Sequence, residues 1–166
     1  MREILFKAKR KDDAKWVEGY FAIICEKTVI IEKESEKYYS IDDEKNSCGN
    51  RITEINPETL CQFTGLCDKN GNKIWENDIL RGHGNNKDLS KVTFGNFGVI
   101  DAETLSAVDN VIGWQYEPIL TDALSKCEPF CLPMPLTNYY IDRCEFEVIG
   151  NIYEGGFENG EGTEEN

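Results

Sequence analysis

The alternation of apolar and polar residues along the chain predicts a series of short β-strands. Trp16 to Cys25 is rich in aromatic and β-branched residues, which favour strands. The segment from Glu145 to Tyr153 alternates Phe146, Val148 and Ile152 with polar neighbours, which is the period of a half-buried strand. Further strands are predicted at Ile4–Ala8, Thr28–Glu32, Lys37–Ile41, Lys73–Arg81, Lys91–Phe94 and Val111–Tyr116.

Turn signals divide these strands. The pair Asn70-Gly71 is a strong hairpin cue, because both residues accept the positive φ that a tight two-residue turn requires. Pro57 biases Asn56 away from helix and starts a second turn. Along Lys73–Arg81 the apolar side chains change face, so this strand is either covered on both faces or interrupted by a bulge.

Evidence for helices is confined to two short segments. Ala102–Asp109 and Thr121–Cys127 each have room for two turns, and Cys127–Pro135 contains three prolines and is predicted to be an extended loop. Short strands separated by Gly and Asn turns are typical of all-β folds. We therefore predict a mainly β fold, a small barrel or sandwich with one or two short helices, in a single domain over residues 1–154.

Composition and charge narrow the range of possible functions. The chain has 166 residues and a mass of 18.9 kDa, with 40% hydrophobic and 30% charged residues, which is typical of a small globular protein. Lys plus Arg number 18 against 31 Asp plus Glu, so the net charge is −13. This charge argues against a protein that coats nucleic acid, because phosphate binding needs a basic surface.

The charge is unevenly distributed. The first 15 residues carry six basic and three acidic side chains, a net charge of +3, which leaves a local basic patch possible on an acidic chain. Residues 155–166 are rich in Gly and Glu and offer little to bury, so we predict a disordered acidic tail there.

The sequence contains no apolar run of membrane-spanning length. The longest run, Tyr20–Cys25, is far shorter than the roughly 20 residues that a spanning helix needs. The N-terminus also lacks the pattern of a signal peptide, so we expect a cytoplasmic protein with no membrane partner. In that compartment the seven cysteines are expected to be thiols: Cys25, Cys48, Cys61, Cys67, Cys127, Cys131 and Cys144.

No motif supplies a catalytic or metal-binding site. The cysteines lack the paired two-residue spacing of structural zinc sites, and the only histidine, His83, lies in a Gly- and Asn-rich loop. Asp68-x-Asn70-x-Asn72 resembles the start of a calcium loop, but Lys73 and Ile79 occupy the places of its required Gly and Glu. We therefore predict no catalytic residue, metal or cofactor, and interpret the motif as a polar hairpin tip.

Three blocks of sequence resemble the YopX family of phage and prophage proteins. They are the opening Met1–Arg10 with Trp16–Tyr20, the central Gln62–Leu66, Asp68–Gly71 and Lys73–Leu80, and the ending Glu147–Glu154. The family usually has Asp at Asn56, Gly at Cys61 and Asn77, and a polar residue at Cys67, so a shared thiol site is not expected. Residues 100–142 match none of the blocks and are predicted to be a variable insertion.

The resemblance implies a compact β-rich protein, encoded by a temperate phage or an integrated element, that acts in the cytoplasm of the bacterial host. It also implies a homo-oligomer. It implies no reaction, so no catalytic residue is carried over. The residues that a shared functional surface would use are Gln62, Thr64, Asp68, Asn70, Glu76 and Asp78, although each of them also fits a role in turn and strand structure.

Together these observations predict a non-catalytic, self-assembling interaction protein with an unidentified host or phage partner. The aromatic residues Phe63, Trp75, Phe94, Phe97 and Trp114 are candidates for the core and for contacts between subunits. Nucleic acid is not the expected partner. The alternative is an acidic DNA mimic, or a nucleic-acid-associated protein, that acts on the DNA-binding machinery of the host.

Overall fold

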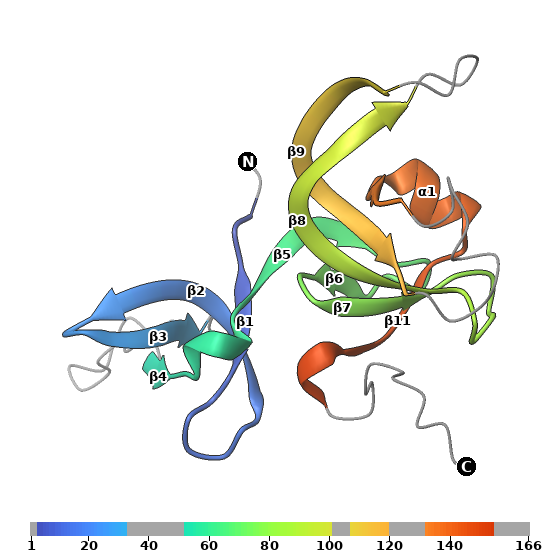
Figure 1. Ribbon diagram of the computed structural model, residues 1–166. Helices are drawn as coiled ribbons and strands as arrows, with labels where there is room; N and C mark the ends of the chain where they lie inside the picture. Colours follow the sequence, from blue (N-terminus) through green and yellow to red (C-terminus); the bar gives the residue numbers. More distant parts are fainter. Residues whose placement is uncertain (1–2, 33–51, 101–106, 120–131, 155–166) are drawn as a thin grey trace, which may run out of the picture. The chain divides into compact units, whose positions relative to one another are not determined.

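The computed structural model describes residues 3–32, 52–100, 107–119 and 132–154 (Figure 1). The chain divides into two compact units, Met1–Phe63 and Thr64–Asn166. Both are built from antiparallel strands, and the described residues contain a single α-helix, so the prediction of a mainly β protein is confirmed.

The first unit is an antiparallel sheet with strand β2 near its middle. The strand order is β4-β3-β2-β1-β5, and β5 continues into the second unit. These strands are β1 (Phe6–Lys9), β2 (Trp16–Ile24), β3 (Lys27–Glu32), β4 (Ile52–Glu54) and β5 (Cys61–Cys67). The strands predicted at Ile4–Ala8, Trp16–Cys25 and Thr28–Glu32 are confirmed to within two residues. The strand predicted at Lys37–Ile41 lies outside the described residues.

The core of the first unit forms where small and branched side chains meet on one side of the sheet. Ala8 and Val17 lie opposite each other on β1 and β2 and pack with Ile30 and Ile55. Gly19 allows a close approach of two strands, because a Cβ there would lie 2.1 Å from the carbonyl oxygen of Ile31.

The predicted turn at Asn56-Pro57 is a short 3₁₀ helix, η1 (Pro57–Thr59). The side chain of Asn56 caps it by accepting a hydrogen bond from the backbone N–H of Glu58 at 3.2 Å. Asp caps helices in the same way, so the Asp expected here from the family resemblance would fill the same role.

The second unit contains a sheet with the order β10-β9-β8-β7-β11, and the hairpin of β5 and β6. The additional strands are β6 (Lys73–Trp75), β7 (Asp78–Arg81), β8 (Leu89–Ile100), β9 (Ala107–Pro118), β10 (Met134–Pro135) and β11 (Glu147–Asn151). The predicted hairpin at Asn70-Gly71 is confirmed, since these residues form the turn between β5 and β6. The strands predicted at Lys91–Phe94 and Val111–Tyr116 are both parts of much longer strands, β8 and β9.

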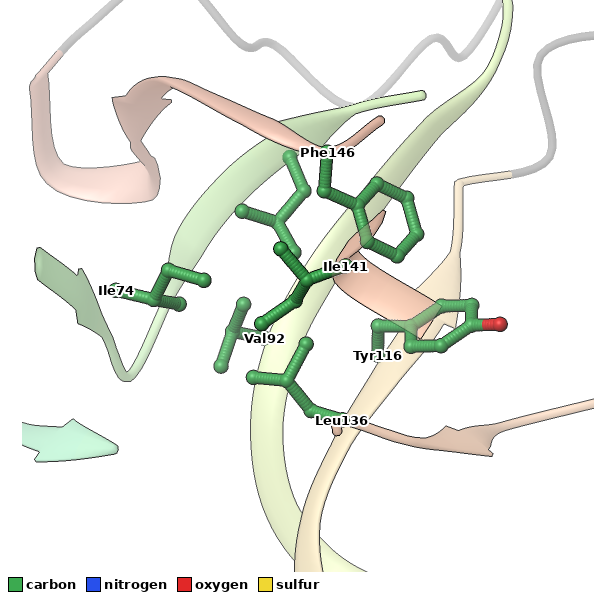
Figure 2. Close-up of a cluster of buried hydrophobic side chains, with 7 residues drawn as sticks. Ile74, Val92, Tyr116, Leu136, Ile141 and Phe146 are labelled. Carbon is green, nitrogen blue, oxygen red and sulfur yellow. The ribbon is translucent and has the colours of Figure 1, made fainter. Parts of the chain in front are cut away.

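The core of the second unit draws on segments that lie far apart in the sequence. Figure 2 shows side chains from β6, β8, β9, the helix and the segment before β11 converging on one cluster. The buried members are Ile74, Leu80, Val92, Tyr116, Leu136, Ile141 and Phe146. Residues 100–142 supply three of these side chains, so their described part is integral to this core. Whether they vary among relatives stays a prediction.

The segment Lys73–Arg81 is interrupted, as the change of apolar face suggested. β6 ends at Trp75, β7 begins at Asp78, and Asn77 between them has a positive φ of 63°. The last predicted strand is also shorter than expected, because β11 ends at Asn151 and a 3₁₀ helix, η2 (Ile152–Glu154), follows.

The helix predictions were wrong where the structure tests them. Ala107 to Asp109 continue the pairing of β9 with β8 and are not helical. Residues 102–106 and the helix predicted at Thr121–Cys127 lie outside the described residues. The observed helix, α1 (Asn138–Arg143), was not predicted; the Thr137 side chain caps it by accepting from the N–H of Tyr140 at 3.3 Å.

Neither sheet closes on itself in the described part of the chain, so the structure does not have the predicted barrel there. In the predicted extended loop Cys127–Pro135, only residues 132–135 are described, and they include the short strand β10. The predicted acidic tail, residues 155–166, lies outside the described residues.

The prediction of one domain is testable through the two cores. We expect Ile30→Ala in the first unit and Phe146→Ala in the second each to destabilise the protein by about 2–5 kcal/mol, because both side chains are fully buried. If the units unfold together, both variants lower the midpoint of one shared urea transition, followed by circular dichroism. Ile23→Ala, at a side chain that is 68% exposed, is the control and should change little. Two transitions, each sensitive to one variant, would show separate domains.

Candidate functional site

The six signature residues do not share one environment. Gln62 belongs to the first unit, where it pairs with Phe6 of β1. In the second unit, Thr64 is buried, and its hydroxyl donates to the carbonyl of Ile74 at 2.8 Å and accepts from the N–H of Leu66. Asn70 is exposed at the tip of the β5–β6 hairpin, and Glu76 is half-buried in the turn after β6. Asp68 and Asp78 are buried.

Asp68 ties the β5–β6 hairpin to the final strand. One carboxylate oxygen accepts from the backbone N–H groups of Asn70 and Asn72 at 2.9 and 2.8 Å. The other accepts from the Asn72 side chain at 3.1 Å and from the N–H of Val148, in β11, at 3.0 Å. Because the carboxylate receives its donors from the protein, the motif that resembles a calcium loop serves as a turn that binds a distant strand.

These hydrogen bonds also set the ionisation of Asp68. Burial alone would raise its pKa, but the donors from Val148, Asn72 and Asn70 outweigh that effect and hold the pKa below its ordinary value of 3.8. The buried carboxylate is therefore ionised at neutral pH.

Asp78 plays a similar part at the other end of β11. It is fully buried, and its carboxylate accepts from the backbone N–H of Trp75 and from the side-chain amide of Asn151, both at 2.8 Å. The same amide donates to the carbonyl of Glu76 at 3.2 Å. Asn151 was not among the predicted site residues, although it lies in the last block of the family resemblance.

The structure therefore gives three of the six residues a structural role. Asp68 and Asp78 hold β11 at Val148 and Asn151, and Thr64 holds β5 to β6. A further role of the six residues in binding stays a prediction.

Two departures from the family pattern have a local explanation. Asn77 has a φ of 63°, a conformation that costs most residues about 1–2 kcal/mol but is open to Gly, the residue expected here from the family resemblance. Asn is the next best choice there, since it visits this region more readily than other residues. Cys61 is fully buried, and its thiol lies 3.4 Å from the carbonyl oxygen of Thr59, so it behaves as a small core residue.

Among the described residues, the arrangement that most resembles a catalytic one lies around Cys144. The His83 backbone N–H donates to the Cys144 carbonyl at 2.8 Å, and the His83 ring lies 3.0 Å from the carboxylate of Asp88. Burial and the negative charge of Asp88 raise the pKa of the Cys144 thiol. An activated nucleophilic cysteine needs the opposite shift, so this arrangement supplies no ready thiolate.

The four described cysteines are thiols, as predicted: Cys25, Cys61, Cys67 and Cys144. Cys48, Cys127 and Cys131 lie outside the described residues. In the described ranges there is no cluster of three or more His, Cys, Asp or Glu side chains placed to hold a metal ion.

No helix in the described part of the chain is long and apolar enough to cross a membrane.

Part of the basic N-terminal segment is paired with nearby acids. Lys11 and Lys27 both contact the carboxylate of Glu54, at 2.6 and 3.0 Å, and these hydrogen bonds lower the pKa of Glu54. Asp12 and Asp13 pair in the same way with Arg10 at 3.2 and 3.6 Å. This pairing weakens the interpretation of the segment as a phosphate-binding patch.

Exposed apolar side chains gather on strands of both units. In the first unit, Tyr20 and Ile24 on β2 and Ile52 on β4 are exposed, and the register of β2, β3 and β4 places them on one face of the sheet. In the second unit, Phe94 on β8 is 55% exposed and Ile112 on β9 is 71% exposed. Monomeric proteins seldom leave groups of large apolar side chains in water, so these surfaces are candidates for binding.

The fold and these contacts define a small, mainly β protein with a buried polar framework around Asp68 and Asp78. The family model described as YopX protein matches residues 5–156, so the chain belongs to the YopX family. No curated protein matches the chain.

The role of Asp68 can be tested through the pH dependence of stability. Asp68→Asn keeps the shape of the side chain but removes the charge that the N–H donors stabilise, so we expect a loss of about 1–3 kcal/mol at pH 7. Since folding lowers the pKa of Asp68, its stabilisation is complete above the ordinary value of 3.8 and disappears as the pH falls through the folded value. Urea unfolding of both proteins between pH 7 and 2.5 measures this difference.

The matched control is Glu58→Gln, at an exposed carboxylate in η1, which should leave stability unchanged over the same pH range. A difference between wild type and Asp68→Asn that stays constant down to pH 2.5 would contradict an ionised, stabilising Asp68.

Proposed function

We propose that this YopX-family chain is a non-catalytic accessory protein of a phage or prophage. It acts in the cytoplasm of the bacterial host by assembling with copies of itself and by binding a protein of the host or the phage. The observation that carries the proposal is the presence of exposed apolar side chains on ordered strands of both units. Apolar surface of this kind is buried by association, which is what a protein that acts by assembly requires.

The buried polar residues favour the same function. The carboxylates of Asp68 and Asp78 are used to bind backbone and amide groups of the chain itself. General acid–base chemistry would need such groups within reach of a substrate. The Cys144 thiol has a raised pKa, the reverse of what nucleophilic catalysis needs.

The alternative function, an acidic DNA mimic, is favoured by one observation, the net charge of −13. It predicts that the protein captures a basic, DNA-binding partner of the host. Such a complex would depend on charge and would weaken steeply as the salt concentration rises.

Native mass distinguishes the two functions. Light scattering on the purified, untagged protein should give a sharp multiple of 18.9 kDa that persists in 1 M NaCl, because apolar contacts are not screened by salt. A species of 18.9 kDa at every concentration would contradict self-assembly. Salt-sensitive capture of a host DNA-binding protein by that monomer would then support the acidic mimic.

A further inference from the structure

The ribbon formed by β8 and β9 is longer than the sheet that supports it. β7 pairs with β8 only from Leu89 to Lys91, and β10 pairs with β9 only at Gln115 and Tyr116. Figure 1 shows β8 and β9 continuing together as a curved two-stranded ribbon past the end of β7. In the described part of the chain, no other strand pairs with this extension. Two-stranded ribbons are at best marginally stable in water unless one face is covered.

One face of the ribbon begins inside the core and ends in solvent. Directly paired residues of antiparallel strands project to the same side, and alternate residues along a strand share a face. Val92 and Tyr116 are paired and buried in the core cluster. The next pair on that face, Phe94 and Trp114, is partly exposed, with ring centroids 5.0 Å apart.

The pair after that places Ile112 opposite Asn96, and Ile112 is 71% exposed. The apolar core face therefore extends past the side chains that cover it, Leu136, Ile141 and Phe146. The opposite face is less exposed, because Phe97 is buried beside Gly113 and Val99 and Val111 are each 38% exposed.

The near absence of charged residues on the ribbon indicates which partner covers this face. Asp109 is the only charged residue among residues 92–100 and 107–116, on a chain whose net charge is −13. A basic protein or a nucleic acid would find almost no charge to pair with here. Two copies of an acidic chain, in contrast, repel each other through their net charge, and this repulsion opposes contact least at an uncharged surface.

We infer that the exposed core face of the β8–β9 ribbon, made by Phe94, Ile112 and Trp114, packs against the same face of a second copy of this chain. Packing one surface against itself gives a two-fold symmetric contact, in which each copy completes the uncovered core of the other. This inference rests on the proposed self-assembly and names the surface that carries it.

The test is the native mass of Ile112→Lys beside that of wild type. The substitution places a charge from each copy at the centre of the contact. We expect the dissociation constant of the assembly to rise about 30-fold or more, as when a central interface residue is lost. Because Ile112 is exposed, the variant should fold normally. Its circular dichroism spectrum and thermal midpoint should match those of wild type diluted until it is monomeric. Ile112→Leu should restore assembly.

The matched control is Ile23→Lys on β2, where the side chain is 68% exposed, and it should assemble like wild type. If Ile112→Lys does not fold, Ile112→Thr replaces it, since Thr keeps the branched shape that strands prefer. An assembled wild type with an undiminished Ile112→Lys assembly would overturn the ribbon contact and leave the proposed function standing. A monomeric wild type would overturn both.

Discussion

Two buried carboxylates organise the second unit. Asp68 and Asp78 lie at the two ends of the segment formed by the hairpin tip, β6 and the following turn, and each accepts hydrogen bonds from β11. The donors, Val148 and Asn151, are separated from them by more than 70 positions in the sequence. A buried carboxylate without such donors would be strongly unfavourable, so the final strand and the hairpin depend on each other.

This dependence explains the role of the signature residues in this chain. Its polar residues resemble a site in the sequence, yet the structure uses Thr64, Asp68 and Asp78 to join strands. We therefore expect partners to bind exposed surfaces and not these buried polar residues. The β8–β9 ribbon is such a surface, because its core face runs beyond the residues that cover it. The chain thus has a buried motif, which specifies the fold, and an exposed apolar face, which we propose carries the assembly.

Short sequence patterns correctly predicted the elements that depend on neighbouring residues. The Asn70-Gly71 hairpin and the strand from Trp16 follow from turn chemistry and β-branched composition, and both were found in place. Helix α1 was missed because it has only six residues, too few to show a helical period. The length of β8 was underestimated because Gly95 and Gly98, which argue against a strand interior, lie within it. The roles of Asp68 and Asp78 depend on partners in β11, and no short stretch of sequence reveals such distant pairs.

A photo-cross-link from the ribbon would detect the proposed contact between two copies of the chain. A photoreactive benzoylphenylalanine in place of Ile112 should, on irradiation, join two copies of the chain, and the bond should map to residues 92–96 or 112–116 of the second copy. The same group in place of Ile23 should give no such product. Cross-links from position 112 that map only within the same chain, or to another surface of a second copy, would contradict the account.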